Sequence, residues 1–275
     1  MTAVPAKPLN DGTSIPQIGF GVFLVPENQT QEAVEAALEV GYRHIDTAAI
    51  YGNEAAVGRA LANSGLPRSE VFVTTKLWND AQGADTVRPA LEASLERLGL
   101  DRVDLYLIHW PTPARDLYVT TWEGLEAAAE RGLTTSIGVS NFLPDHLARI
   151  AALGGRVPAV NQVECHPTLQ QCDVLKADDR LGVVTEAWSP LGRGADLEIA
   201  DISTIAARVG ATPAQVVLAW HLARGRVVIP KSVTPARIVE NLASVDVRLS
   251  GTDLDALDAL DSGTRIGPDP ATYQG

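Results

Sequence analysis

The sequence predicts an α/β fold: a closed (β/α)8 TIM barrel with an N-terminal β-hairpin and two extra helices. The first observation is a repeated alternation, in which an apolar run rich in β-branched residues precedes a segment whose apolar residues recur every three or four positions. The second is the length of 275 residues, which suits a single barrel of about 250 residues with small additions. Because no linker or change of composition interrupts the alternation, we expect one domain over residues 1–275.

Eight strand-helix units follow one another along the chain, and that number implies a parallel barrel. The strand-like runs are residues 21–25, 43–45, 71–75, 103–108, 136–139, 159–163, 183–186 and 227–229. The helix-like segments are residues 30–40, 53–62, 86–98, 118–130, 144–153, 169–179, 213–222 and 235–242. Gly41, Gly65 and Gly99 follow the first three helices, where a left-handed C-cap is expected.

Three further segments lie outside this repeat. The Asp11-Gly12 pair between two extended pieces predicts a hairpin ahead of the first unit. Residues 201–209 and 252–260 have the helical period and are predicted as the two extra helices. The last residues, 262–275, are rich in glycine and proline and are expected to lie over the surface as a tail.

Composition restricts the possible partners. A formal net charge of -12 leaves no broad basic surface for nucleic acid. No apolar run approaches the roughly 18 residues of a membrane span, and the first residues lack the apolar segment of a signal peptide. The two cysteines, Cys165 and Cys172, indicate reduced thiols in a cytoplasmic protein, and we expect no metal site.

Polar side chains recur where the predicted strands end. In a TIM barrel the functional groups come from these carboxyl ends, where the loops converge. In order, the residues there are Asp46, Lys76, His109, Asn141, Gln162, Trp188 and Lys231. Alone, Asp46 can equally be a helix cap, and a lone histidine is more often a core residue than a catalyst. Titratable groups at three successive strand ends, with Tyr51 on the loop between the first two, favour a site.

The chemistry that suits this set is proton donation. An unperturbed tyrosine has a pKa near ~10, and a nearby ammonium lowers that value by stabilising the phenolate. Lys76 can supply the ammonium, and Asp46 can keep it charged. His109 can donate a hydrogen bond to the same carbonyl oxygen. The four residues therefore fit the protonation of an alkoxide as it forms, with a hydride delivered by a cofactor.

The cofactor cannot be held by a Rossmann glycine loop, because no strand is followed by GxGxxG. A nicotinamide would lie across the barrel mouth, stacked on Trp188, with Ser140, Asn141 and Gln162 at its carboxamide. In the last strand-helix turn, Lys231, Ser232 and Arg237 combine cations, a hydroxyl and a helix N-terminus. Such a combination suits a phosphate, and the last loops of a barrel are its usual phosphate site.

Motifs in the same order along almost the whole chain resemble the aldo-keto reductase superfamily, and most closely its short bacterial branch of the diketogluconate reductase type. They are LNDGTSIPQIGFGVF, GYRHIDTAAIYGNE, TTKLWND, DLYLIHWP, SIGVSNF, PAVNQVECHP, WSPLG and IPKSV. Several such motifs in sequence are far more specific than one. The resemblance implies the barrel fold, carbonyl reduction and NADPH as cofactor.

The resemblance also implies a role for each matching residue. Tyr51 would be the general acid, tuned by Lys76 and Asp46, and His109 would position the carbonyl. The implied cofactor-binding residues are Ser140, Asn141, Gln162, Trp188, Ser189, Leu191, Lys231, Ser232, Val233, Arg237, Glu240 and Asn241. The implied substrate walls are Phe23, Ile50, Trp78 and Trp110.

Two departures from the family pattern are visible. Thr234 stands where many relatives have another basic residue, which predicts a looser grip on the adenosine 2′-phosphate. The segments after Trp110 and at the C-terminus are short, which predicts a more open pocket. An apolar and aromatic wall of this kind accepts carbonyls with little discrimination.

We therefore expect a cytoplasmic, monomeric, metal-free enzyme that uses NADPH to reduce aldehydes, α-dicarbonyls, small ketones or keto-sugars. One alternative is a Schiff-base aldolase that uses Lys76, although Asp46 would keep that lysine protonated and unreactive. Another is an NADPH-binding sensor or partner module with little turnover. Turnover with a carbonyl substrate separates these alternatives.

Overall fold

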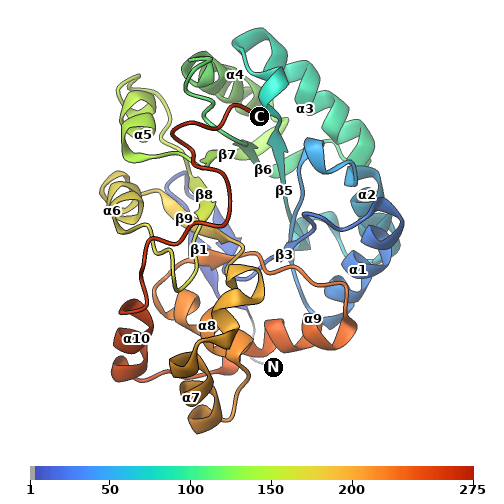
Figure 1. Ribbon diagram of the computed structural model, residues 1–275. Helices are drawn as coiled ribbons and strands as arrows, with labels where there is room; N and C mark the ends of the chain where they lie inside the picture. Colours follow the sequence, from blue (N-terminus) through green and yellow to red (C-terminus); the bar gives the residue numbers. More distant parts are fainter. Residues whose placement is uncertain (1–3) are drawn as a thin grey trace.

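A parallel barrel forms the centre of the computed structural model, which describes residues 4–275 (Figure 1). Its eight strands are hydrogen-bonded in chain order. They are β3 (Phe20–Gly21), β4 (His44–Asp46), β5 (Phe72–Leu77), β6 (Val103–Ile108), β7 (Thr134–Ser140), β8 (Val160–Glu164), β9 (Val184–Trp188) and β10 (Val227–Val228). Ile18 closes the barrel through a parallel bridge to Val228. The predicted (β/α)8 fold is confirmed.

Helices surround the strands, as Figure 1 shows. Those that alternate with the strands are α1 (Glu27–Val40), α2 (Glu54–Asn63), α3 (Ala84–Leu98), α4 (Tyr118–Glu130), α5 (Pro144–Ala151), α6 (Cys172–Leu181), α8 (Pro213–Ala223) and α9 (Pro235–Leu242). The two predicted extra helices are α7 (Ala200–Val209) and α10 (Gly251–Asp258). Both pack around the fully buried Trp220 of α8, whose indole donates to Asp258 at 2.7 Å. The two helices therefore form a small core beside the barrel.

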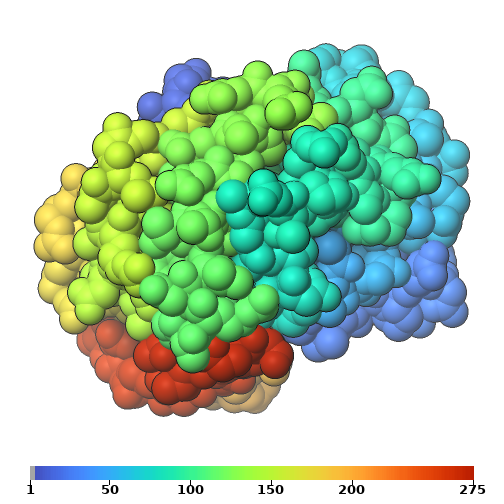
Figure 2. All heavy atoms as spheres, turned by 90° about the horizontal axis from the view of Figure 1, so that it is seen from above, coloured from blue at the N-terminus to red at the C-terminus, as the bar shows by residue number. Residues whose placement is uncertain are grey.

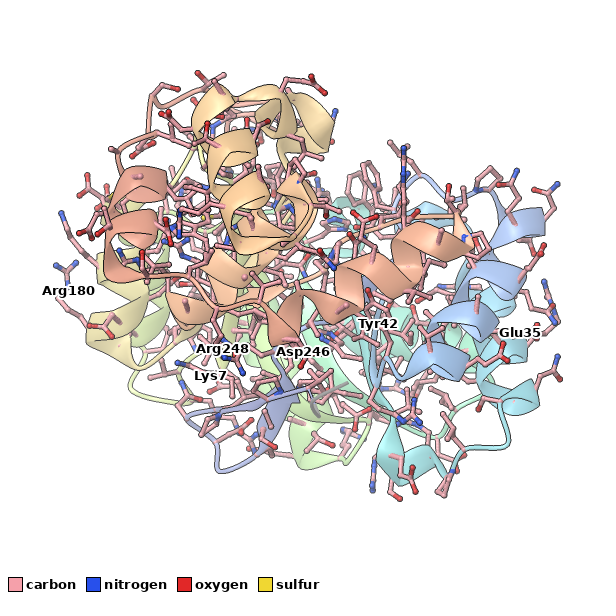
Figure 3. The ribbon with its side chains drawn as sticks, turned by 90° about the horizontal axis from the view of Figure 1, so that it is seen from below. Lys7, Glu35, Tyr42, Arg180, Asp246 and Arg248 are labelled. Atoms are coloured by element: carbon pink, nitrogen blue, oxygen red, sulfur yellow. The ribbon has the colours of Figure 1, made fainter. Side chains whose placement is uncertain are left out.

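The ring of helices around the barrel closes where α9 packs against α1. The buried Tyr42, just after α1, donates from its hydroxyl to the carbonyl of Ile238 in α9 at 3.2 Å (Figure 3). Burial raises the pKa of Tyr42, so the phenol keeps the proton that it donates. Apolar side chains of α1 and β4, including Val34 and Ile45, fill the layer between helices and strands.

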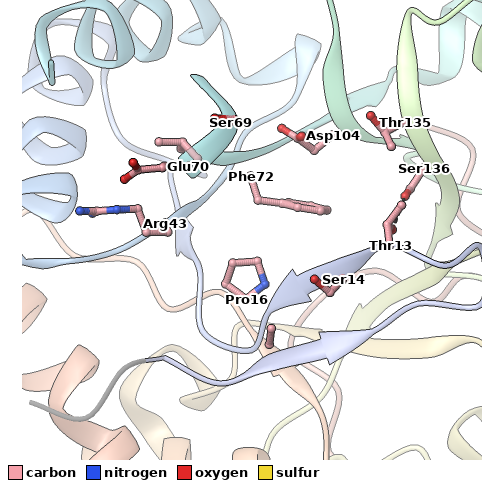
Figure 4. Close-up of a pocket in the computed structure, with 12 residues that line it drawn as sticks. Thr13, Ser14, Pro16, Arg43, Ser69, Glu70, Phe72, Asp104, Thr135 and Ser136 are labelled. Carbon is pink, nitrogen blue, oxygen red and sulfur yellow. Dashed lines mark hydrogen bonds between the residues drawn. The ribbon is translucent and has the colours of Figure 1, made fainter. Parts of the chain in front are cut away.

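The predicted hairpin covers the N-terminal end of the barrel. It consists of β1 (Ala6–Pro8) and β2 (Ser14–Pro16), and it packs Leu9 and Ile15 against inward-facing residues of β6 and β8. A cavity of about 240 Å³ lies beside it (Figure 4). Two of its charged residues already have partners, since Arg43 donates to two carbonyls and Asp104 accepts from Arg68. The polar strand-end residues lie at the opposite end of the barrel.

The first strand is shorter than predicted. The run 21–25 was expected to be extended, but the strand ends at Gly21, and Leu24 has a φ of 59°. The amide of Asn53 donates to the carbonyls of Val22 and Val25 at 3.0 and 3.2 Å. The Asn53 side chain thus takes the place of a neighbouring strand as hydrogen-bond partner of these two backbone carbonyls. Phe23 consequently lies in a loop rather than in a strand.

Between residues 4 and 275, no single helix is long and apolar enough to cross a bilayer. The pair formed by α7 and α8 reaches the required length and composition only jointly, across a bend of 89°.

The crossing of α2 and α3 yields a test of the packing. A Cβ on Gly58 of α2 would lie 2.4 Å from the backbone oxygen of Leu98. Although alanine is otherwise the better helix former by about 1 kcal/mol, we expect Gly58→Ala to lower the free energy of unfolding by roughly 1–3 kcal/mol, as overpacked cores do. Urea denaturation measures the change.

Gly251→Ala is the matched control, because a Cβ there meets nothing within 4 Å at the start of α10. It should be neutral or stabilise by up to about 1 kcal/mol. Equal effects of the two substitutions would contradict the close approach of α2 and α3.

Candidate active site

Asp46 and Lys76 form a buried ion pair at the carboxyl ends of neighbouring strands. Asp46 is the last residue of β4, and Lys76 lies near the end of β5. The lysine Nζ is 2.6 Å from Oδ1 of Asp46 and donates also to the carbonyl of Thr47 at 2.9 Å. Lys76 is fully buried and Asp46 is 2% exposed. A charged lysine is tolerated there because both contacts compensate for lost water.

Tyr51 and His109 lie against this pair. Tyr51 ends the short 3-10 helix η1 (Ala49–Tyr51), which the left-handed Gly52 terminates. The Lys76 Nζ lies 5.2 Å from the centroid of the tyrosine ring. The imidazole of His109, which follows β6, meets the same ring edge-on at 5.7 Å. The four predicted catalytic residues therefore lie in one cluster at the carboxyl ends of β4, β5 and β6.

The pKa of Tyr51 differs from the sequence-based expectation. Burial raises it to about 12, although the ammonium of Lys76 acts in the opposite direction. The sequence identified the neighbouring cation correctly but gave no measure of how far the hydroxyl is removed from water. At neutral pH the phenol is therefore protonated and available as a donor.

The other two titratable groups have opposite shifts. Burial alone would lower the pKa of Lys76, but Asp46 and Tyr51 together raise it, so the amine is held as ammonium. This disfavours the aldolase alternative, which needs a neutral amine. Burial, together with Lys76, holds the pKa of His109 well below its ordinary value, so the imidazole is neutral.

A second group of predicted residues lies beside the first. Asn141, in a left-handed conformation with φ of 64°, donates to the carbonyl of His109 at 3.0 Å and accepts from the indole of Trp188 at 2.8 Å. Ser140 donates to the backbone oxygen of Gln162 at 2.7 Å. Hydrogen bonds thus connect the ends of β6, β7, β8 and β9 into one surface.

Sequence reasoning missed Glu186, a buried carboxyl of β9 on the same face as Trp188. Its Oε2 accepts from the amide of Gln162 at 2.8 Å, and the same amide nitrogen donates to Asp46 at 2.8 Å. The available signal was the alternation of a strand, because a charged residue two positions before Trp188 must point into the barrel as well. Glu186 was interpreted only as the end of a strand.

The predicted substrate walls surround the mouth. Phe23 is 44% exposed and packs on Tyr51 at 5.1 Å between ring centroids, and Ile50 is 48% exposed. Trp78 meets His109 edge-on at 5.1 Å. Trp110 is only 7% exposed, because the ring of Tyr273 lies 4.4 Å from it.

Tyr273 belongs to the C-terminal tail, which crosses the barrel opening (Figure 1) and lies against the green middle part of the chain in Figure 2. The tail is anchored by Glu164 of β8, which accepts from the backbone N–H groups of Ile266 and Gly267 at 2.6 and 2.9 Å. A Cβ on Gly267 would lie 2.4 Å from the Trp188 ring. The tail therefore lies against Trp188 and Trp110, while the expected openness of the pocket stays a prediction.

The residues predicted for the phosphate end lie at the turn from β10 into α9. Lys231 and Arg237 are exposed, and neither forms an ion pair within the described part of the chain. Ser232 accepts from the N–H of Thr234 at 3.1 Å, while Glu240 accepts from Thr212 at 2.7 Å. Val233 is 45% exposed beside them, and Asn241 is buried. Ser189 and Leu191 lie elsewhere, in the loop that follows β9, and Ser189 has a φ of 48°.

These features fit a nicotinamide dinucleotide phosphate. The amide oxygen of Gln162 has no hydrogen-bond partner among residues 4–275, and the Trp188 indole presents a flat, half-exposed ring held by Asn141. At the other end, Lys231 and Arg237 offer two unpaired cations to an anion. An acceptor for an amide, a ring for stacking and a cationic turn are the three kinds of group that such a cofactor needs.

Comparison with known proteins agrees with this geometry. The model of the Aldo/keto reductase family matches residues 17–262. An aldo-keto reductase from Mycolicibacterium smegmatis is 51% identical over 269 residues, which is 98% of either chain. One from Mycolicibacterium vanbaalenii is 52% identical over 273 residues, 99% of this chain and 98% of the other.

Solved structures give the same result. A mutant of Gox0644 in complex with NADPH has a TM-score of 0.95 at 44% identity, covering 99% of both chains. A Bombyx mori aldo-keto reductase in complex with NADP has a TM-score of 0.91 at 35% identity, covering 98% of this chain and 96% of the other. The chain therefore belongs to the aldo/keto reductase family. It is an NADP-dependent oxidoreductase that reduces carbonyl groups.

The anchor of the tail yields a prediction about pH. His166 lies between Asp196 and Glu164, at 2.8 and 3.1 Å, and these carboxylates outweigh burial and raise its pKa to about 9. A raised folded pKa stabilises the protein fully below the unfolded value near 6.5, and this stabilisation is lost as pH rises through about 9. We expect the free energy of unfolding to fall by about 2 kcal/mol over that window, after allowance for solvent screening.

His166→Gln should flatten this pH dependence in urea denaturation at about pH 6.5 and 9.5. Burial also raises the pKa of Glu186 and Asp178, so part of the decline with rising pH should remain in the variant. An unchanged slope in His166→Gln would show that the imidazolium does not stabilise the anchor.

Proposed function

We propose that this enzyme reduces aldehydes, α-dicarbonyls and small ketones, keto-sugars included, to alcohols, with hydride from NADPH and a proton from Tyr51. The observation that carries the proposal is the pocket in which Tyr51 meets the buried Lys76–Asp46 pair and the neutral His109. Apolar residues would pack this position better than a phenol, an ammonium and an imidazole. The presence of these three groups together therefore favours a chemical role over a packing role.

Each side chain of the pocket has a separate task in this mechanism. His109 donates a hydrogen bond to the carbonyl oxygen and fixes its direction. NADPH, when bound, supplies the hydride to the carbonyl carbon. Tyr51 gives its proton to the oxygen as negative charge develops there, which is favourable because an alkoxide is far more basic than a phenolate. Lys76, held charged by Asp46, stabilises the phenolate that remains.

The proposed cofactor position follows from the polar groups around the pocket. The carboxamide would lie at Gln162, Ser140 and Asn141, with the ring on Trp188. The 2′-phosphate end would lie at Lys231 and Arg237, with Ser232, Val233, Glu240 and Asn241 completing that subsite. The substrate would enter between Phe23, Ile50, Trp78 and Trp110. Because these walls are apolar, they supply contact area and leave orientation to the catalytic residues.

Tyr51→Phe should lower kcat by about 10²–10⁴-fold, the usual contribution of a positioned acid, while leaving the Kd for NADPH within about threefold. NADPH oxidation with methylglyoxal, aromatic aldehydes, simple ketones and keto-sugars measures the first quantity. Quenching of tryptophan fluorescence measures the second.

Tyr106→Phe is the control for the loss of a phenol. Tyr106 is buried in β6, and its hydroxyl has no hydrogen-bond partner within residues 4–275. Turnover should be unaffected in that variant. Full activity of Tyr51→Phe would remove Tyr51 from the mechanism, and tight NADPH binding without turnover on any substrate would favour the sensor alternative.

Arg237→Ala tests the phosphate end. Because the guanidinium is exposed and unpaired within the described residues, its loss should weaken the interaction with a 2′-phosphate and little else. We expect KM for NADPH to rise about tenfold, or ~1.4 kcal/mol, with KM for NADH almost unchanged. Arg88→Ala, which removes an exposed arginine paired only with Glu92 of its own helix, should alter neither KM. Equal effects on both cofactors would place the 2′-phosphate elsewhere.

A further inference from the structure

Glu186 is a second buried carboxyl behind the catalytic pair. It lies opposite Gln162 in the register of β8 and β9 and is 0% exposed. The amide nitrogen of Gln162 is 2.8 Å from Oε2 of Glu186 and 2.8 Å from Oδ2 of Asp46. Both N–H groups of that amide are therefore used by carboxyl oxygens, which directs its oxygen away from them.

The surroundings of Glu186 contain too little positive charge to compensate for a second carboxylate beside Asp46. From β4, Asp46 and His44 face it, and the His44 Nε2 is 3.7 Å from Oε1. From β5, Lys76 is the one cation that acts on it within residues 4–275, and that ammonium is already paired with Asp46. Tyr51 of η1 is the remaining titratable group, and it is neutral.

The strands beside Glu186 add no charge, since β8 presents the amide of Gln162 and β10 presents Val227. Oε1 of Glu186 is buried without a hydrogen-bond partner in the described chain. Burial and the negative charge of Asp46 raise the pKa of Glu186 to about 8, and burial lowers that of His44 to about 3. At neutral pH the carboxyl is therefore protonated beside a neutral imidazole.

We propose that Glu186 is a positioning residue that responds to the oxidation state of the cofactor: it orients Gln162 toward the nicotinamide and carries a proton that is released to solvent when the oxidised cofactor binds. The inference rests on the cofactor position given under Proposed function. A dihydropyridine ring is neutral, whereas the oxidised ring is a cation, and a cation at the mouth favours an ionised carboxyl behind Gln162.

The consequence is a difference between the two cofactors that depends on pH. NADP+ should bind more tightly as pH is raised toward about 8 and level off above it, because binding then costs no proton release. NADPH should show no such change. We expect the ratio of Kd for NADP+ to Kd for NADPH to fall about tenfold between pH ~6 and ~8.5. Ionisation of the 2′-phosphate cancels in this ratio, since both cofactors carry it.

The experiment titrates each cofactor into the full-length enzyme and follows tryptophan fluorescence across that pH range. Glu186→Gln keeps the shape and the acceptor for Gln162 but cannot ionise, and its ratio should be independent of pH. Tyr51→Phe should retain the fall, which excludes the phenol as its source. Asp178→Asn should retain it too. Asp178 is a buried carboxyl of α6 whose pKa burial raises to about 7, and it bonds to Asn161 and Thr185 outside the catalytic pocket.

A second measurement needs no variant. NADP+ added to the weakly buffered wild-type enzyme near pH ~7.5 should release a fraction of a proton to an indicator dye, and NADPH should release none. Equal release with both cofactors, or a ratio that does not change with pH in the wild type, would overturn the role of Glu186. A fall that persists in Glu186→Gln and vanishes in Tyr51→Phe would overturn it as well. Failure of either cofactor to bind at any pH would instead refute the proposed cofactor site.

Discussion

The ammonium of Lys76 is the constraint on which the barrel mouth depends. A lysine without solvent contact must be paired, and here one carboxylate and one backbone carbonyl accept hydrogen bonds from its ammonium. The carboxylate comes from the adjacent strand, because Asp46 ends β4, which pairs in parallel with β5. Asp46 in turn orients Gln162 from the far side of the barrel. One buried charge therefore organises residues from three strands.

The two ends of the barrel differ for the same reason. At the N-terminal end the hairpin segment adds Leu9 and Ile15 to a buried apolar cluster between the strands, which forms an apolar plug. Toward the other end, inward-facing positions carry carboxyl, amide and ammonium groups, and hydrogen bonds link Lys76 to Asp46 and Gln162 to both Asp46 and Glu186. The apolar plug lowers the local dielectric and strengthens these interactions. The apolar packing thus lies at the N-terminal end of the barrel, and the polar cluster lies at the carboxyl ends of the strands.

Much of this arrangement was predictable from the sequence. The alternation of strand-like and helix-like segments predicted the barrel. The rule that functional groups lie at the carboxyl ends of the strands pointed to Asp46, Lys76 and His109. What could not be predicted depended on burial and on contacts across the barrel. The pKa of Tyr51 is set by how far its hydroxyl is withdrawn from water, and the partner of Glu186 lies on another strand. The tail sequence has neither the helical nor the strand periodicity, so its contacts with Trp188 and Trp110 could not be predicted.

The C-terminal tail is attached to the barrel differently from the polar side chains at the strand ends. Asp46 and Lys76 lie on strands and Tyr51 lies on a short turn beside them, whereas Tyr273 reaches Trp110 from a segment whose contacts with Glu164 end at Gly267. Residues beyond Gly267 can vary in length and shape without moving Asp46 and Lys76, because these two residues lie on strands. The surroundings of Trp110 can therefore change through a few residues at the end of the chain while the Lys76–Asp46 pair stays in place.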